Sequence, residues 1–333
     1  MKAVAIIGGG FCGAVCARIL EKKLPEGYSL ILFDRKKDFE YTPSVHKLIT
    51  DVDYEKRITV PYSRFLKRAK IINDEIVSVS AVEKSIKTKQ AGYMFDYLVA
   101  CSGSVTPKPN IINAFVLKSV NDAHAIREKF SAVKNVIIVG GGFTGVEIAG
   151  ELATKTDKKI EIVHAGKRLL DRLPESVSVK AQRFLERKGV SVRLNESRDK
   201  FDCDLVIWSA GIKAETYFIE GFPLNDRGCV QVDLNLRVKG YDNIFAGGDI
   251  ADLPEEKCAQ NAQIHGRIIA ENVINSISKK KLVEYAPKKR IMVVSLGDYY
   301  SIMAFPDFVL SGIIPSMIKK MIEIMVVRGT SGR

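Results

Sequence analysis

Val136–Leu152, which reads VIIVGGGFTGVEIAGEL, decides how the rest of the chain is interpreted. A β-branched run is followed by three glycines spaced G-x-G-x-x-G and then by a helical pattern of apolar residues. In a strand–turn–helix unit, such glycines permit a tight turn, a close approach of backbone to a pyrophosphate, and tight packing of helix on strand. The N–H groups and dipole at the helix start favour the anion. The residues predicted to bind a dinucleotide here are Gly140, Gly142, Phe143, Thr144 and Gly145.

A second copy of the pattern opens the chain, where residues 3–20 read AVAIIGGGFCGAVCARIL. The apolar run Lys2–Ile7 predicts a strand buried on both faces, and a helix is expected to follow as far as Lys23. The next apolar run, Tyr28–Phe33, ends at Asp34, where a dinucleotide-binding unit places its ribose-binding acid. The residues predicted to bind this first dinucleotide are Gly8, Gly10, Phe11, Cys12, Gly13, Asp34 and Arg35.

Both copies end with an acid, an apolar strand and a turn of small residues. Phe95–Cys101 reads FDYLVAC, and Asp204–Trp208 reads DLVIW. This internal repeat predicts an α/β fold with two related Rossmann-like dinucleotide-binding domains. The turns that return the chain to the edge of each nucleotide contain Cys101, Ser102 and Gly103 in the first copy and Ala210 and Gly211 in the second.

The remaining segments show weaker patterns. Ile71–Gln90 alternates as a small antiparallel meander, and Val230–Val238 alternates as a pair of edge strands. Pro174–Lys188 and Asn261–Ser276 each show an apolar helical face. Asn243–Asp249 reads NIFAGGD, which predicts a strand that returns to the first domain. The residues that this stretch adds to the first nucleotide site are Gly248 and Asp249.

The composition fits a folded protein with a large core. The 333 residues are 46% hydrophobic and 27% charged, so bulk disorder is not expected. A net charge of +12 suits anionic cofactors or an anionic membrane surface, and we expect no nucleic-acid partner. The six cysteines form neither a C-x-x-C pair nor a zinc-like quartet, which predicts a reducing, cytosolic environment without a metal site. No apolar stretch is long enough to predict a membrane-spanning helix.

The second copy lacks the ribose-binding acid of the first. The strand after its glycines, Ile160–Val163, ends at His164, with Lys167 and Arg168 close behind. A carboxylate at this position selects NAD, whereas a neutral or basic side chain tolerates the 2′-phosphate of NADP. His164 is therefore predicted to lie at the nucleotide, either admitting NADPH or only packing near the adenine.

The order of these motifs resembles the two-dinucleotide-binding-domain flavoproteins. Within that group, GGGFTGVEIAGEL is similar to the second motif of type II, non-proton-pumping NADH:quinone dehydrogenases. His164 resembles the variant of the apoptosis-inducing-factor-like quinone reductases, which accept either nicotinamide. The resemblance covers about residues 1–275 and implies FAD, bound non-covalently, in the first domain and NAD(P)H as co-substrate in the second. The implied boundaries are 1–106 with 216–286 for the FAD-binding domain, 107–215 for the inserted NAD(P)H-binding domain, and 287–333 for a C-terminal segment.

The resemblance also implies roles for individual residues. Glu147 matches a carboxylate that lies where nicotinamide meets flavin, and the alternative is a helix residue bonded to neighbouring backbone. Asp249 matches an acid that contacts the ribityl–pyrophosphate part of the flavin. Ala259 and Gln260 match the start of a quinone-site pattern, A-Q-x-A-x-Q, but Ile264 replaces its second glutamine. Glu147 and Gln260 are therefore the candidate catalytic residues, and backbone at Ala259 is expected beside the flavin.

The C-terminal stretch Phe305–Arg328 reads FPDFVLSGIIPSMIKKMIEIMVVR. It predicts an amphipathic helix with Lys319, Lys320 and Glu323 on one side, which Pro315 would start or kink. We expect its apolar face in lipid and its lysines at headgroups, on the cytoplasmic side of an anionic membrane. The alternative is a helix that covers the core or forms a homodimer.

The function that the resemblance implies is transfer of electrons from NAD(P)H through FAD to a quinone. A disulfide reductase needs a C-x-x-x-x-C pair beside the flavin, and Cys12 and Cys16 are in the wrong place for it. A sulfide:quinone reductase stays an alternative: the second glycine motif lacks its reactive cysteine, but Cys101 and Cys258 remain as thiols. A soluble NAD(P)H reductase for ferredoxin or rubredoxin would not need the C-terminal helix. A redox-sensing flavoprotein would bind nicotinamide tightly and turn over slowly.

Overall fold

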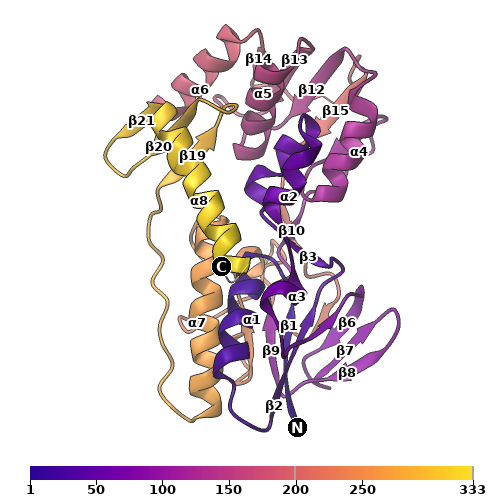
Figure 1. The fold of residues 1–333 in the computed structure, drawn as a ribbon, viewed down its shortest axis with the longest axis vertical. Coiled ribbons are helices and arrows are strands. Elements are labelled where there is room, and N and C mark those ends of the chain that lie inside the picture. Colours follow the sequence, from indigo (N-terminus) through magenta and orange to yellow (C-terminus); the bar gives the residue numbers. More distant parts are fainter. Residues whose placement is uncertain (199, 332–333) are drawn as a thin grey trace.

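Two five-stranded parallel sheets, one for each glycine motif, form the framework of the chain (Figure 1). The computed structural model describes residues 1–198 and 200–331. The first sheet has the order β18-β9-β1-β2-β5 and the second β11-β15-β12-β13-β14. The strands of the first are β1 (Lys2–Ile7), β2 (Tyr28–Phe33), β5 (Lys70–Ile72), β9 (Tyr97–Ala100) and β18 (Ile244–Ala246). Those of the second are β11 (Ala114–Val116), β12 (Asn135–Val139), β13 (Lys159–His164), β14 (Ser191–Leu194) and β15 (Leu205–Trp208).

The two sheets repeat the same arrangement, which confirms the predicted duplication. In each, the strand before the glycines is central, the next strand lies on one side, and the closing strand lies on the other. Because β18 belongs to the first sheet although it follows the whole second sheet in the chain, the second unit is inserted in the first. The domain boundaries proposed above stay a prediction.

Each glycine motif leads into a helix, as predicted. Helix α1 (Phe11–Lys23) follows the first motif, and α5 (Phe143–Lys155) follows the second. The other long helices of the two units are α4 (Val120–Phe130), α6 (Glu175–Arg187) and α7 (Ala259–Ile277). A Cβ placed on Gly266 of α7 would lie 2.3 Å from the carbonyl oxygen of Cys12, so glycine lets α7 pack directly on α1. This packing covers the first sheet and brings the start of α7 near the first glycine loop.

Smaller elements complete the first unit. The meander predicted at Ile71–Gln90 is confirmed for β6 (Ile76–Ser80) and β7 (Ser85–Thr88), but its start is β5 of the first sheet. Strands β8 (Gly92–Met94) and β17 (Ile219–Glu220) complete the small sheet. The predicted strand pair at Val230–Val238 is wrong, because only isolated bridges form there. The other short elements are β3 (Asp38–Glu40), η1 (Thr42–Ile49), η2 (Val52–Tyr54), α2 (Glu55–Ile58), β4 (Thr59–Pro61), α3 (Tyr62–Phe65), β10 (Ser104–Val105), β16 (Lys213–Ala214) and η3 (Gly248–Ile250).

The C-terminal segment forms a three-stranded antiparallel sheet and a long helix. The strands are β19 (Met292–Ser295), β20 (Ser301–Ala304) and β21 (Val309–Gly312), and the helix is α8 (Ile313–Ser331). In Figure 1, α8 (yellow) runs from this sheet beside the second unit toward the first unit. The first part of the predicted helix is therefore a strand, and the helix begins only at Ile313.

The apolar side of α8 faces outward, as expected, but its polar side is not placed as predicted. Glu323 is 7% exposed and the side chain of Lys319 is 13% exposed, so this polar side faces the protein rather than lipid headgroups. Of the predicted polar side chains, Lys320 alone is exposed. We define the apolar face of α8 as its exposed side chains Ile313, Ile314, Met317, Met321, Ile324 and Met325. Across residues 1–198 and 200–331, no helix is both long and apolar enough to cross a bilayer.

Candidate functional site

The first glycine loop, residues 8–13, is shaped for close backbone contact. Gly8 has a φ of +89°, and a Cβ there would lie 2.3 Å from the carbonyl oxygen of Cys101. A Cβ on Gly13 would lie 1.8 Å from the carbonyl oxygen of Gly8. At Gly10, by contrast, a Cβ would meet no described atom within 4 Å, and no side chain caps the start of α1. The uncapped N–H groups thus face open space, which fits the pyrophosphate of a dinucleotide.

Asp34 is fixed at the end of β2 by three donors. Its Oδ2 accepts hydrogen bonds from the Gly9 N–H at 2.6 Å and the Tyr62 hydroxyl at 3.0 Å, and its Oδ1 accepts from Lys36 N–H at 2.8 Å. Burial, together with the neighbouring Asp34 carboxylate, raises the pKa of Tyr62, so this hydroxyl remains a donor. The predicted ribose-binding acid is therefore held beside the loop.

Arg35 lies at the crossing between the two units. Its guanidinium forms an ion pair with Glu215 at 3.0 Å, and the hydroxyl of Ser102 donates to the Glu215 carbonyl at 2.6 Å. Burial raises the pKa of Glu215, although Arg35 opposes the shift. Arg35 and Ser102 thus fasten the returning chain next to the first loop. Gly103, with a φ of +82°, continues this turn.

Asp249 reaches the same region from η3. Its Oδ2 accepts a hydrogen bond from Ser104 Oγ at 2.5 Å, and Lys118 Nζ lies 3.8 Å away. The N–H of the preceding Gly248 donates to Nδ1 of His265 at 3.1 Å. The structure therefore brings Asp249 and Gly248 to the first loop, as predicted from the sequence. Lys118 contributes a positive charge here. It was not predicted, because it lies between the two glycine motifs and belongs to neither pattern.

Two cysteine sulfurs meet behind the first loop. The Sγ atoms of Cys12 and Cys101 lie 2.6 Å apart, and both residues are buried. Burial and the neighbouring Cys101 raise the pKa of Cys12 well above its usual value. Because the thiolate is the reactive form, Cys12 is a poor nucleophile. Both cysteines pack as core residues.

The second glycine loop, residues 140–145, repeats the geometry of the first. Gly140 has a φ of +112°, and a Cβ on Gly145 would lie 1.8 Å from the carbonyl oxygen of Gly140. At Gly142 a Cβ would meet no described atom within 4 Å, and α5 begins there without a side-chain cap. Phe143 and Thr144 form the first turn of that helix. The second unit therefore repeats the uncapped helix start, a geometry that favours an anion.

The far wall of the second loop is the turn after β15. A Cβ on Gly140 would lie 2.9 Å from the Ala210 nitrogen, and Ser209 Oγ donates to the Gly140 carbonyl at 3.2 Å. Gly211 follows with a φ of +74°. Ala210 and Gly211 therefore lie at the loop, as predicted. Cys101 occupies the corresponding place beside Gly8 in the first unit.

His164 takes the structural place of Asp34. In the first unit the Gly9 N–H donates to Asp34, and in the second the Gly141 N–H donates to His164 Nδ1 at 3.2 Å. Nδ1 is thus the acceptor, which puts the proton of the neutral ring on Nε2. The second unit therefore keeps the backbone contact of the ribose-binding acid without its negative charge.

Glu147 lies one turn into α5 and is buried, with 7% exposure. Its Oε1 accepts a hydrogen bond from the Ser295 N–H at 3.0 Å and forms an ion pair with Lys319 of α8. Both interpretations of Glu147 therefore stay open: it is bonded to backbone, and it also carries a charge partner near the second loop. Lys319 was missed as a site residue because only the fold brings residues so distant in sequence together.

Gln260 lies in the first turn of α7, where its amide donates to the Ile291 carbonyl at 3.3 Å. Its side chain is exposed and Ala259 is partly buried, and both lie at the helix start that faces η3.

His46 on η1 is buried, and burial together with Lys319 and Lys47 lowers its pKa well below the usual value. A neutral histidine therefore lies among cationic neighbours.

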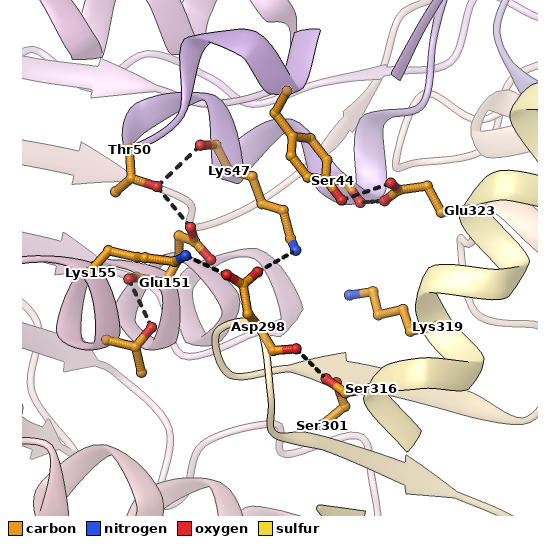
Figure 2. Close-up of polar contacts among 12 residues, drawn as sticks. Ser44, Lys47, Thr50, Glu151, Lys155, Asp298, Ser301, Ser316, Lys319 and Glu323 are labelled. Carbon is orange, nitrogen blue, oxygen red and sulfur yellow. Dashed lines mark hydrogen bonds and ion pairs between the residues drawn. The ribbon is translucent and has the colours of Figure 1, made fainter. Parts of the chain in front are cut away.

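A polar network surrounds the junction of η1, α5 and α8 (Figure 2). Asp298, in the turn between β19 and β20, pairs with Lys47 at 3.1 Å and also with Lys155. Thr50 Oγ1 donates to Glu151 Oε1 at 2.7 Å. Burial opposes ionisation of Asp298, but the two lysines outweigh it and lower its pKa to about 2. The network ties the C-terminal segment to both units.

Comparison with known proteins agrees with this fold. The family described as pyridine nucleotide-disulphide oxidoreductase matches residues 2–266. Apoptosis-inducing factor homolog A of Dictyostelium discoideum is 28% identical over 346 residues, which cover 89% of this chain and 83% of that protein. Demethylphylloquinone reductase NdbB of Synechocystis sp. is 27% identical over 289 residues, covering 75% and 72%. The structure of NDH2 from Plasmodium falciparum in complex with NADH matches with a TM-score of 0.85 at 18% identity, over 98% of this chain and 94% of that one.

Proposed function

Because the chain belongs to the pyridine nucleotide-disulphide oxidoreductase family, we propose that it is an FAD-dependent enzyme that passes electrons from NAD(P)H to a quinone. The observation that carries this proposal is the pair of equivalent glycine loops, each an uncapped helix start facing open space. Two dinucleotides can be bound by one chain in this way. The name of one relative, a demethylphylloquinone reductase, points to a quinone as acceptor.

The first loop is proposed to bind FAD and the second NAD(P)H. Asp34 would bind the adenosine ribose of FAD, and Asp249 with Lys118 would lie along its ribityl and pyrophosphate part. At the second loop, His164 would meet the adenosine ribose of the nicotinamide cofactor. When bound, the flavin takes a hydride from the nicotinamide and passes on two electrons, chemistry that belongs to the cofactor.

The protein groups supply positioning and charge. Glu147 orients the Lys319 ammonium through their ion pair, and both side chains are mostly buried. In this site Lys319 can donate a hydrogen bond or a proton to a quinone oxygen that gains negative charge. Gln260 and the backbone at Ala259 would line the opposite side of the quinone. No protein nucleophile is required, which agrees with the high pKa of Cys12.

The apolar face of α8 is proposed to rest on a membrane. A contiguous set of exposed isoleucine and methionine side chains is unusual on a water-facing helix and suits the interface region of a bilayer. A lipid-soluble quinone would then reach the site from the membrane, with the protein bound peripherally on the cytoplasmic side.

An anaerobic titration tests this function. The purified protein is expected to be yellow, to bleach with NADH or NADPH, and to recover its colour when a short-chain quinone is added. Sulfide alone, used as a control, should not bleach it. A colourless protein, or bleaching by sulfide but not by nicotinamide, would refute the proposal. Bleaching without reoxidation by any quinone would instead favour transfer to a small iron protein or a redox-sensing role.

A further inference from the structure

A cavity of about 370 Å³ lies where η1 and α2, α5 and α8 meet. Its lining includes no residue of either glycine loop. It does include Lys47 and Lys155, the two lysines that pair with Asp298 in Figure 2, and side chains from the last turns of α8. Its basic lining residues, one more than its acidic ones, are Lys47, Arg57, Lys155, Lys320 and Arg328. The cavity is therefore lined by both charged and apolar side chains and lies outside the two glycine loops.

Most of the acidic groups of the lining are already bound. Both oxygens of Asp298 face lysine ammonium groups. Glu323 accepts a hydrogen bond from the Tyr54 hydroxyl at 2.7 Å and another from Ser44. Glu151 is 2% exposed, and burial raises its pKa, which reduces its negative charge. Asp51 is the fourth acidic lining residue and keeps an exposed carboxylate, so the five basic side chains outnumber the acidic ones by one.

Two exposed cations of the lining, Arg57 and Lys320, lie over aromatic rings. The Arg57 guanidinium lies 5.3 Å from the centre of the Tyr54 ring, and Lys320 Nζ lies 5.4 Å from the centre of the Tyr299 ring. Within the part of the chain that the structure describes, neither Arg57 nor Lys320 forms an ion pair. Stacking on the rings orients both charges while leaving their N–H groups available to a ligand.

The cavity is continuous with the apolar face of α8. Ile324 lines the cavity and also belongs to that face, where it is 48% exposed. Lys320 lies one turn earlier on the same helix and is followed by the exposed Met321. A ligand with an anionic end in the cavity could therefore lay an apolar tail along the helix.

We propose that this cavity binds the phosphate headgroup of an anionic membrane phospholipid, with Arg57 and Lys320 as its main ligands and the acyl chains along α8. The excess of basic over acidic lining residues suits a phosphate headgroup, and the adjoining apolar face of α8 suits acyl chains. This inference rests on the proposed membrane docking and adds a site that recognises one class of lipid.

Vesicle binding by the full-length holoprotein tests the site. The double variant Arg57→Gln with Lys320→Gln is compared with the wild type on phosphatidylcholine vesicles and on vesicles that also contain phosphatidylglycerol. We expect about thirtyfold weaker binding to the anionic vesicles, the effect of two lost charges near an anionic surface, and no change on neutral ones. The matched control is Lys87→Gln with Lys188→Gln, which removes two exposed charges elsewhere and should weaken anionic binding far less.

A second variant predicts the opposite change. Asp298→Asn removes the partner of Lys47 and Lys155, which would then be available to the phosphate. We expect it to bind phosphatidylglycerol vesicles more tightly than the wild type, a gain that mere loss of stability would not give. Unchanged or weaker binding would contradict the assignment of this cavity.

Soluble probes separate a lipid from free phosphate. Short-chain phosphatidylglycerol, used below its micelle concentration, should raise the Tm of the wild type and not that of the Arg57→Gln, Lys320→Gln variant. An equal rise with inorganic phosphate alone would identify a free-phosphate site and overturn the lipid assignment. Equal vesicle binding by this variant and the Lys87→Gln, Lys188→Gln control would also overturn it.

Activity with a water-soluble quinone, without vesicles, separates this inference from the proposed enzyme function. The double variant should retain wild-type turnover, since neither side chain belongs to the nucleotide or quinone sites. A wild type that reduces no quinone but still prefers anionic vesicles would refute the function and keep the lipid site. A wild type that reduces quinone but binds no vesicles would refute the lipid site alone.

Discussion

Glu147 and Lys319 form the charge pair on which the proposed chemistry depends. Glu147→Gln and Lys319→Met are each expected to lower kcat with a soluble quinone by about 100-fold. The first removes the carboxylate that orients the ammonium, and the second removes the ammonium itself. The double variant should be no slower than the worse single variant, since the two groups act as a unit. Steady-state kinetics together with flavin absorbance make the measurement.

The control for this pair is Glu151→Gln, one turn further along α5 and without contact to Lys319. It should retain most of the wild-type turnover. If the losses of Glu147→Gln and Lys319→Met simply multiply in the double variant, the two residues act independently and the proposed role is wrong.

We expect His164 to determine whether the second unit accepts the 2′-phosphate of NADPH. His164→Glu would place a carboxylate where the neutral ring now accepts the Gly141 N–H. The ratio of kcat/KM for NADPH to that for NADH should fall at least about tenfold, since a carboxylate repels the 2′-phosphate. His164→Gln, which stays neutral, should leave the ratio within about threefold of the wild-type value; an equal fall in both variants would show that charge is not the cause.

Because of Asp298, the free energy of unfolding should depend on pH in the acidic range. Its pKa is lowered from 3.8 to about 2 in the folded protein, so its stabilising effect is complete above the unfolded value and is lost as the pH falls through that interval. Asp298→Asn should cost about 1 kcal/mol at neutral pH and little at pH values near 2. Urea unfolding across this range measures both; a constant difference at every pH would contradict the assignment.

At the scale of the element, α8 is amphipathic as expected, but its polar side packs on the protein instead of facing headgroups. Its charged side chains Lys319 and Glu323 face the protein, and its isoleucine and methionine side chains face outward. The sequence pattern gives the helical period and the two faces but not which face is buried. That choice depends on residues distant in the chain: Glu147 pairs with Lys319, and the hydroxyl groups of Ser44 and Tyr54 donate to Glu323.

The outward face of α8 makes a prediction of its own. Met317→Lys with Met325→Lys should weaken binding to neutral and anionic vesicles alike, by about tenfold or more, because apolar area no longer enters the interface. Turnover with a soluble quinone should persist. The matched control places lysines at Val77 and Val82, which are exposed apolar residues outside α8; equal loss in both would mean that α8 is not the docking surface.

At the scale of the whole molecule, the duplicated loops should be separable. Gly10→Asp and Gly142→Asp each put a carboxylate into open space at a helix start, without a clash. The first should give a colourless protein. The second should stay yellow but resist bleaching by nicotinamide, since a charge at the loop repels the pyrophosphate. The reverse pattern of colour and bleaching would exchange the two cofactor assignments.

How far the sequence predicts the molecule depends on the range of the interactions. Strands Lys2–Ile7 and Tyr28–Phe33 match their predicted bounds, because continuous apolar runs and glycine turns are local signals. The antiparallel sheet β19–β21 was missed since its strands are short and its pairing follows from packing on α5. Lys319 was assigned to lipid headgroups for the same reason. Its partner, Glu147, lies 172 residues away in the chain.

The bond between Ser44 and Glu323 has a consequence for how the protein is made. The two residues are 279 positions apart, so a ribosome needs on the order of 15–60 s after adding the first before it adds the second. Until Glu323 has been added, Ser44 and Tyr54 lack the carboxylate that accepts hydrogen bonds from their hydroxyl groups in the folded protein. Translation therefore finishes this region long after the nucleotide loops can form, and a nascent chain could acquire its cofactor before its helix.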